Sequence, residues 1–146
     1  MRIAVGSDHG GFDLKQEIIR YLKESGHTYR DFGAYSTDPV DYPDFAKAVG
    51  QTVAEGHFER GILICGTGIG ASISANKIKG IRAALCHDNY TARMSREHND
   101  ANVLCLGGRV TGAGVALDII ETWLKTDFSR ADRHRRRVDK VMALEG

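Results

Sequence analysis

The chain has 146 residues, of which 42% are hydrophobic and 27% are charged, and its formal net charge is +1. This length fits one domain, residues 1–146, and leaves no room for separate cofactor and substrate domains. The composition is that of a soluble globular protein, and the balanced charge creates no overall field that would attract nucleic acid or a membrane surface.

Short apolar runs alternate with amphipathic stretches along the chain. The apolar runs predict strands at residues 3–5, 28–32, 61–65, 82–86 and 103–106. Helical spacing of apolar side chains predicts helices at residues 12–25, 44–55, 69–77, 90–97, 111–124 and 130–144. Residues 34–43, which contain both prolines, are expected to be the least regular stretch. This alternation predicts an α/β fold with a five-stranded parallel sheet and helices on both of its faces.

The apolar runs and the cysteines indicate a cellular location. No run approaches the roughly 20 residues of a membrane span, and the run at residues 3–5 is too short for a signal peptide. Cys65, Cys86 and Cys105 each lie at or near the end of an apolar run, and three is an odd number for a disulfide framework. We therefore expect reduced thiols in a cytoplasmic protein, with two of the three cysteines in the core.

Glycine and polar residues follow most of the predicted strands. In a parallel sheet, ligands bind beyond the carboxyl ends of the strands, so these residues should meet at one edge. The segments are 7–11, 65–70, 87–88 and 107–109. Such an edge is typical of an anion-binding site.

The loop from Cys65 to Gly70 runs from a strand into a helix, and its glycines expose backbone N–H groups that bind anions. It lacks the lysine of a Walker A motif, and Ala71 stands where a cysteine phosphatase needs arginine. A dinucleotide fingerprint fits it literally, with Asp88 as the acidic partner, but too few residues follow for a substrate domain. A tight turn with Cys65 in the core is the remaining alternative.

Several motifs taken together resemble one family, ribose-5-phosphate isomerase type B, whose superfamily includes galactose-6-phosphate isomerase subunits. The resemblance covers essentially the whole chain. The motifs are Asp8-His9-Gly10-Gly11, Cys65 to Gly70, Ala75-Asn76-Lys77, Arg96 to Asn102, Gly107-Gly108-Arg109 and Arg133-His134-x-x-Arg137.

The resemblance implies a Rossmann-like αβα sandwich and proton transfer between C1 and C2 of a sugar phosphate through an enediolate. It implies no metal and no cofactor. It also implies a homodimer, or a dimer of dimers, in which the C-terminal helix reaches the active site of the other subunit. Some members use cysteine as the base and others a later glutamate. Cys65 is present here and serines follow the loop at Ser72 and Ser74, so the chain resembles the cysteine branch.

The resemblance also implies the catalytic roles. Cys65, just before a helix N-terminus that favours a thiolate, would be the base. Thr67 would hydrogen-bond either the thiolate or a substrate hydroxyl. His98 suits proton transfer during opening of the sugar ring, although an isolated histidine at a helix end is more often structural. The backbone of Gly66, Thr67, Gly68, Ile69 and Gly70 would bind the enediolate oxygen.

The remaining expected binding residues hold the phosphate and the sugar. Arg133 and Arg137 lie four residues apart and would share one helix face as a phosphate clamp, joined by Arg109 and His9. The alternative is that the C-terminal arginines form a solvent-exposed basic helix face with no role in binding. Asn99 would bind substrate, and Asp8 would either bind the sugar or cap the first helix.

The preferred reaction is interconversion of ribose 5-phosphate and ribulose 5-phosphate in the pentose phosphate pathway. Allose or galactose 6-phosphate is the alternative substrate. A nucleotide-binding module and a subunit that needs a second, different chain are the other classes. Cys65 and His98 occur together in this chain, which favours a self-sufficient homomer.

Overall fold

The computed structural model describes residues 1–146 and contains one sheet in which all five strands run parallel, in the order β2-β1-β3-β5-β4. The strands are β1 (Arg2–Ser7), β2 (Thr28–Asp31), β3 (Arg60–Cys65), β4 (Ala83–Leu85) and β5 (Val103–Gly107). All five predicted strands are therefore confirmed, as is the parallel sheet. β3 is buried along its whole length, as a central parallel strand between two helical layers must be.

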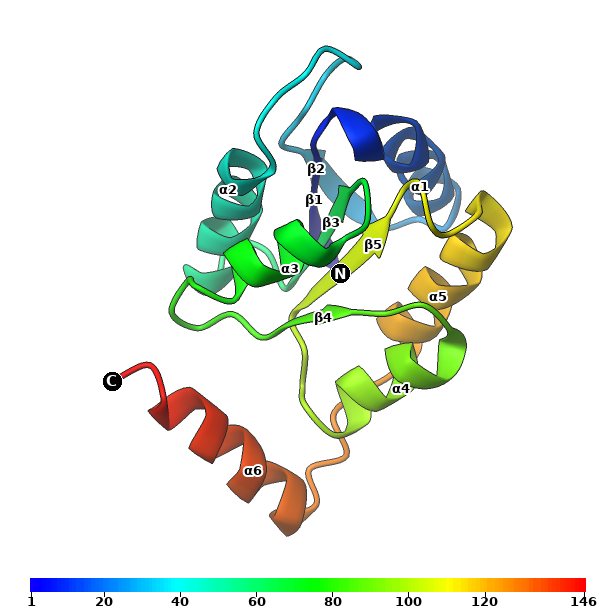
Figure 1. Cartoon of the computed structure of the whole chain (residues 1–146). Coiled ribbons are helices and arrows are strands. Elements are labelled where there is room, and N and C mark those ends of the chain that lie inside the picture. Colours follow the sequence, from blue (N-terminus) through cyan, green and yellow to red (C-terminus); the bar gives the residue numbers. More distant parts are fainter.

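Helices cover both faces of the sheet (Figure 1). The helical elements are the 3-10 turn η1 (His9–Gly11), α1 (Phe12–Glu24), α2 (Tyr42–Ala54), α3 (Ile69–Ala75), α4 (Asn89–Glu97), α5 (Ala113–Lys125) and α6 (Asp132–Ala143). α1, α4 and α5 supply one hydrophobic core and α2 and α3 the other. Alternate residues of β3 enter the two cores, with Ile62 and Ile64 on one side and Leu63 and Cys65 on the other. The αβα sandwich is thus confirmed.

The segment expected to be least regular ends earlier than predicted. α2 begins at Tyr42 and includes Pro43 in its first turn, where a missing N–H costs nothing because those groups have no helical acceptor. The turn η1, which the apolar pattern did not reveal, follows β1 and is capped by Asp8.

α6 stands apart from the two layers (Figure 1). Only one of its residues, His134, is buried. Two buried arginines fix the chain just before it. Arg60 donates to the carbonyl oxygens of Trp123 (2.7 Å) and Leu124 (3.2 Å), and Arg96 donates to that of Thr126 (3.1 Å). α6 therefore leaves the body of the molecule from a well-anchored point.

Burial and, to a smaller extent, the neighbouring Arg96 lower the pKa of Arg60 to about 10. That value still leaves the guanidinium charged at neutral pH.

None of the helices has both the length and the apolar character needed to cross a bilayer.

Candidate active site

The loops that follow β1, β3 and β5 meet at the carboxyl edge of the sheet. Asp8 donates its N–H to the carbonyl of Ile64 (3.2 Å), and Gly108 donates to that of Cys65 (2.8 Å). Arg109 donates to the carbonyl of Gly66 (3.0 Å). Backbone hydrogen bonds therefore lock three loops into one rigid unit around Cys65.

Two glycines permit this contact. Gly68 has φ +81°, and an added Cβ would lie 2.5 Å from the Leu85 side chain. A Cβ on Gly108 would lie 2.6 Å from the carbonyl oxygen of Gly10. Any side chain would strain the first position and push the loops apart at the second.

Cys65 is buried, yet its sulfur has a polar partner. Gly68 donates its N–H to Cys65 Sγ at 3.1 Å, and such a donor stabilises a thiolate. The other two cysteines differ, because burial raises the pKa of both Cys86 and Cys105 and holds them as thiols. All three cysteines are free and buried, whereas the sequence predicted two in the core.

The glycine loop keeps several N–H groups available. Gly68 donates to the thiol, and Ile69 donates to Thr67 Oγ1 at 3.2 Å. The N–H groups of Gly66, Thr67, Gly70 and Ala71 have no acceptor within the protein. Up to four amides are therefore available to bind an anionic oxygen. Compared with the predicted set, Gly66 to Gly70, this set gains Ala71 and loses Gly68 and Ile69.

Thr67 does not contact the thiol. Its exposed hydroxyl accepts from Ile69, which leaves its own hydrogen free for a substrate. Of the two expected roles of Thr67, the geometry favours the substrate hydroxyl.

Three further candidate residues lie at this edge. Asp8 Oδ1 accepts from the Gly11 N–H at 3.1 Å, so Asp8 is the predicted cap, although of η1. His9 Nδ1 accepts from the Val40 N–H at 3.1 Å, which leaves Nε2 as the donor. The Arg109 guanidinium lies beside Gly66, whose added Cβ would be 3.1 Å from Arg109 Nη1. All three therefore lie on the loops that meet at the carboxyl edge, the edge at which β3 ends in Cys65.

His98, Asn99, Arg133 and Arg137 lie at the opposite edge of the sheet. α4 begins beyond the carboxyl end of β4 and ends at Glu97, shortly before the amino end of β5 (Figure 1). His98 is the residue that follows α4. Ser129 donates its N–H to the carbonyl of Glu97 (3.1 Å), so the chain that leads into α6 also starts there. A single chain therefore does not bring these four residues to Cys65.

Arg133 and Arg137 of α6 are exposed and form no ion pair within the chain. Two unpaired guanidinium groups on one exposed helix face are free to bind an anion.

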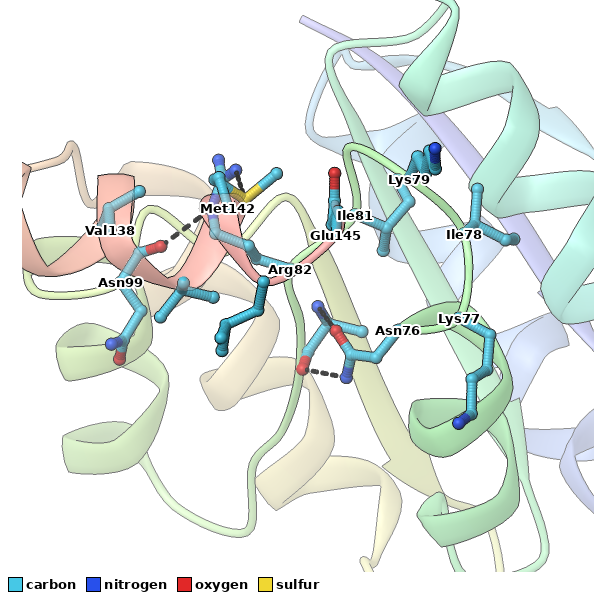
Figure 2. Close-up of a pocket in the computed structure, with 13 residues that line it drawn as sticks. Asn76, Lys77, Ile78, Lys79, Ile81, Arg82, Asn99, Val138, Met142 and Glu145 are labelled. Atoms are coloured by element: carbon cyan, nitrogen blue, oxygen red, sulfur yellow. Dashed lines mark hydrogen bonds between the residues drawn. The ribbon is translucent and has the colours of Figure 1, made fainter.

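α6 also borders a hollow of about 530 Å³, which contains none of the expected site residues except Asn99. Figure 2 shows this hollow between α6 and the chain that follows α3. Arg82 donates to Met142 Sδ (3.1 Å) and to the carbonyl of Asn99 (3.0 Å), and the Gly80 N–H donates to Glu145 (2.9 Å). These contacts tie the outer half of α6 to the body of the molecule.

The acidic residue of the dinucleotide alternative has another role. Asp88 caps α4, accepting from the Thr91 N–H (2.7 Å) and hydroxyl (2.8 Å). These hydrogen bonds lower the pKa of Asp88. Asp88 therefore has a structural role as the cap of α4, which accounts for its position without a dinucleotide. No cluster of three or more His, Cys, Asp or Glu side chains is arranged to hold a metal ion.

Comparison with known proteins agrees with the fold and the motifs. The model of the family described as Ribose/Galactose Isomerase matches residues 3–141.

The chain belongs to the ribose/galactose isomerase family.

Relatives in this family match over nearly full length. Ribose-5-phosphate isomerase B of Escherichia coli is 47% identical over 144 residues, which span 99% of this chain and 96% of the relative. The structure of the Clostridium thermocellum ribose-5-phosphate isomerase B is 55% identical, with a TM-score of 0.97 over 99% of this chain and 97% of that one. The Mycoplasma genitalium enzyme, solved with bound ribulose-5-phosphate, is 41% identical, with a TM-score of 0.93 over 99% and 95% of the two chains.

Three residues outside the expected catalytic and binding set also shape the site. Tyr42 lies over Gly70, whose added Cβ would be 2.5 Å from the Tyr42 ring. The Val40 amide orients His9. His134 packs against His98, with ring centroids 4.3 Å apart. Its position between Arg133 and Arg137 in one motif was a sequence signal, but its burial depends on tertiary contacts.

Proposed function

We propose that this protein is a sugar-phosphate isomerase that interconverts ribose 5-phosphate and ribulose 5-phosphate by proton transfer through an enediolate. The observation that carries the proposal is Cys65: a thiol held by the Gly68 N–H, at the start of a loop with four unpaired amides. A base beside donors for a developing oxyanion is what proton abstraction next to a carbonyl requires.

The reaction begins when the Cys65 thiolate removes the proton from C2 of the open-chain aldose. The C2–H electron pair forms a C1–C2 double bond, and O1 takes the negative charge, which the loop amides stabilise. A proton then moves from O2 to O1, for which the Thr67 hydroxyl is placed. The Cys65 thiol returns its proton to C1, which leaves the carbonyl at C2 and regenerates the thiolate.

The assembly we propose is a homodimer with two shared sites. In each site, the carboxyl edge of one chain supplies Cys65, Thr67, Asp8, His9 and Arg109. The opposite edge of the partner supplies the remaining four residues. His98 would open the sugar ring, Asn99 would bind the sugar, and Arg133 and Arg137 would bind the phosphate. Support comes from the placement of these groups at opposite edges and from the exposure of α6, of which only His134 is buried.

Exposed apolar side chains provide surface for such an interface. Ile69 and Ile73 on α3 are 53% and 59% exposed, and Val141 on α6 is 49% exposed. A homodimer is the smallest assembly that completes the site. The three free cysteines support a reducing, cytoplasmic location for the enzyme.

An isomerisation assay with ribose 5-, allose 6- and galactose 6-phosphate tests the substrate, with EDTA in a parallel series. We expect fastest turnover of ribose 5-phosphate and no effect of EDTA. Preference for a hexose phosphate would overturn the proposed sugar, and loss of activity in EDTA would overturn proton transfer without a metal. Tight binding of NAD or AMP in calorimetry would instead favour a nucleotide-binding module.

A further inference from the structure

We propose that His134 is a positioning residue for His98, a neutral imidazole that holds the ring-opening histidine in place. The inference rests on the proposed isomerase function. It concerns a side chain that has no role in the proton-transfer step at Cys65.

The contact between the two histidines is direct. Their ring centroids lie 4.3 Å apart with an interplanar angle of 35°. His134 is 6% exposed and is the one buried residue of α6, whereas His98 is exposed at the end of α4. The one side chain that α6 buries is thus a histidine, and its ring packs against His98.

A hydroxyl fixes the orientation of the His134 ring. Ser129 Oγ lies 2.5 Å from His134 Nδ1. The Ala131 N–H donates to the same oxygen at 3.3 Å, which leaves the hydroxyl hydrogen for Nδ1. Nδ1 is then the acceptor and Nε2 carries the proton of the neutral ring.

The charges around His134 favour its neutral form. Burial lowers the pKa of His134, and His98, Arg133 and Arg137 lower it further, against a smaller opposite effect of Glu97. A protonated His134 would place a further positive charge beside Arg133, Arg137 and His98. A neutral His134 leaves His98 as the member of the pair that exchanges a proton with the sugar.

Ribulose 5-phosphate separates ring opening from the rest of the reaction. It cannot close a furanose ring, because the O5 that would attack C2 carries the phosphate. Exchange of its C1 hydrogen with solvent deuterium therefore needs Cys65, the glycine loop and the arginine clamp, but no ring opening. Consumption of ring-closed ribose 5-phosphate needs all of these and ring opening as well.

The test measures both rates, at low substrate concentration, in His134→Phe, His134→Lys and Ser129→Ala. Phe keeps a flat neutral ring, Lys adds a permanent cation, and Ala removes the orienting hydroxyl. We expect ribose 5-phosphate consumption to fall roughly tenfold in the Phe and Ala variants and roughly a hundredfold in the Lys variant. C1 exchange should stay within about twofold of wild type in all three.

His57→Asn is the matched control, since His57 is an exposed histidine paired only with Glu55. It should leave both rates unchanged. Parallel losses of exchange and consumption in the His134 variants would overturn the proposal, because they would mean that His134 merely holds α6 and its arginines. Unchanged consumption in folded Phe and Ala variants would overturn it as well. Failure of the proposed function is distinguishable, since wild type would then show neither rate.

Discussion

At the scale of single residues, the surroundings of the three cysteines distinguish Cys65, the proposed base, from Cys86 and Cys105. Burial raises the pKa of the Cys86 and Cys105 thiols, and at Cys86 it outweighs the opposite effect of hydrogen bonds with Ser95 and Thr91. Cys65 lies at the end of β3, where Gly68 donates to its sulfur. The turn into α3 thus gives Cys65 a backbone N–H donor at a helix N-terminus.

This difference predicts the effect of Cys65→Ala. Ribose 5-phosphate turnover and C1 exchange of ribulose 5-phosphate should both fall by roughly a thousandfold or more, because the base is lost. Calorimetry should still detect substrate binding. Cys86→Ala is the control and should keep near-normal turnover. Near-normal activity in Cys65→Ala would show that another group is the base.

His98→Asn should have a more selective effect. Asparagine cannot transfer the ring-opening proton, so consumption of ring-closed ribose 5-phosphate should fall by roughly a hundredfold. C1 exchange of ribulose 5-phosphate should change by no more than about twofold, because that substrate has no ring to open. NMR in deuterium oxide follows both reactions, and equal losses in the two would contradict ring opening as the role of His98.

At the scale of secondary structure elements, the arginines beneath Trp123 determine where α6 begins. Arg60 and Arg96 both lie near the Trp123 ring, 5.3 Å and 6.0 Å from its centroid. Their guanidinium groups bond the last carbonyls of α5 and of the chain beyond it. β3 therefore carries the base at one end and the anchor for α6 at the other.

Arg60→Met should destabilise the fold by about 3 kcal/mol, since it leaves buried carbonyl oxygens without a charged donor. Urea unfolding measures this free energy. Arg20→Met removes an exposed arginine paired with Glu17 and should cost no more than about 0.5 kcal/mol. If Arg60→Met lost no more stability than Arg20→Met, water would be replacing the guanidinium as the donor to these carbonyls.

At the scale of the whole molecule, the two halves of the proposed site lie at opposite edges of one sheet. The half around Cys65 depends on loops that follow strands, and the half around His98 depends on a helix that precedes one. This separation supports the proposal that the second half of each site comes from another copy of the chain.

Complementation between inactive variants tests this arrangement. A mixed dimer of Cys65→Ala and Arg137→Ala has one doubly altered site and one intact site. Random pairing in coexpression should therefore restore about a quarter of wild-type activity. Coexpression of Cys65→Ala with Arg109→Ala is the control, because both changes lie on the same edge and leave no intact site. Equal, low activity in both mixtures would contradict a shared site.

The sequence by itself determined the order of the elements and the chemistry of their ends. Uninterrupted apolar runs, such as that of β3, have few alternatives to a buried parallel strand, and the glycines after them mark loops. The position of Cys65 directly after a strand placed it at the carboxyl edge, because the carboxyl ends of parallel strands meet there.

Only the tertiary structure decided how the side chains meet. Thr67 binds the loop backbone and not the thiol, Asp8 caps a turn that no apolar pattern reveals, and His134 is buried against His98. The reason is physical: strands and helices follow from local periodicity, whereas His98 and His134 are far apart in sequence and meet only in the folded chain. The hydrogen bonds of Asp8, Cys65 and Thr67 are local, but the partner of each depends on the conformation of its loop. Thr67 was one expected donor to the thiolate, and the Gly68 amide donates instead.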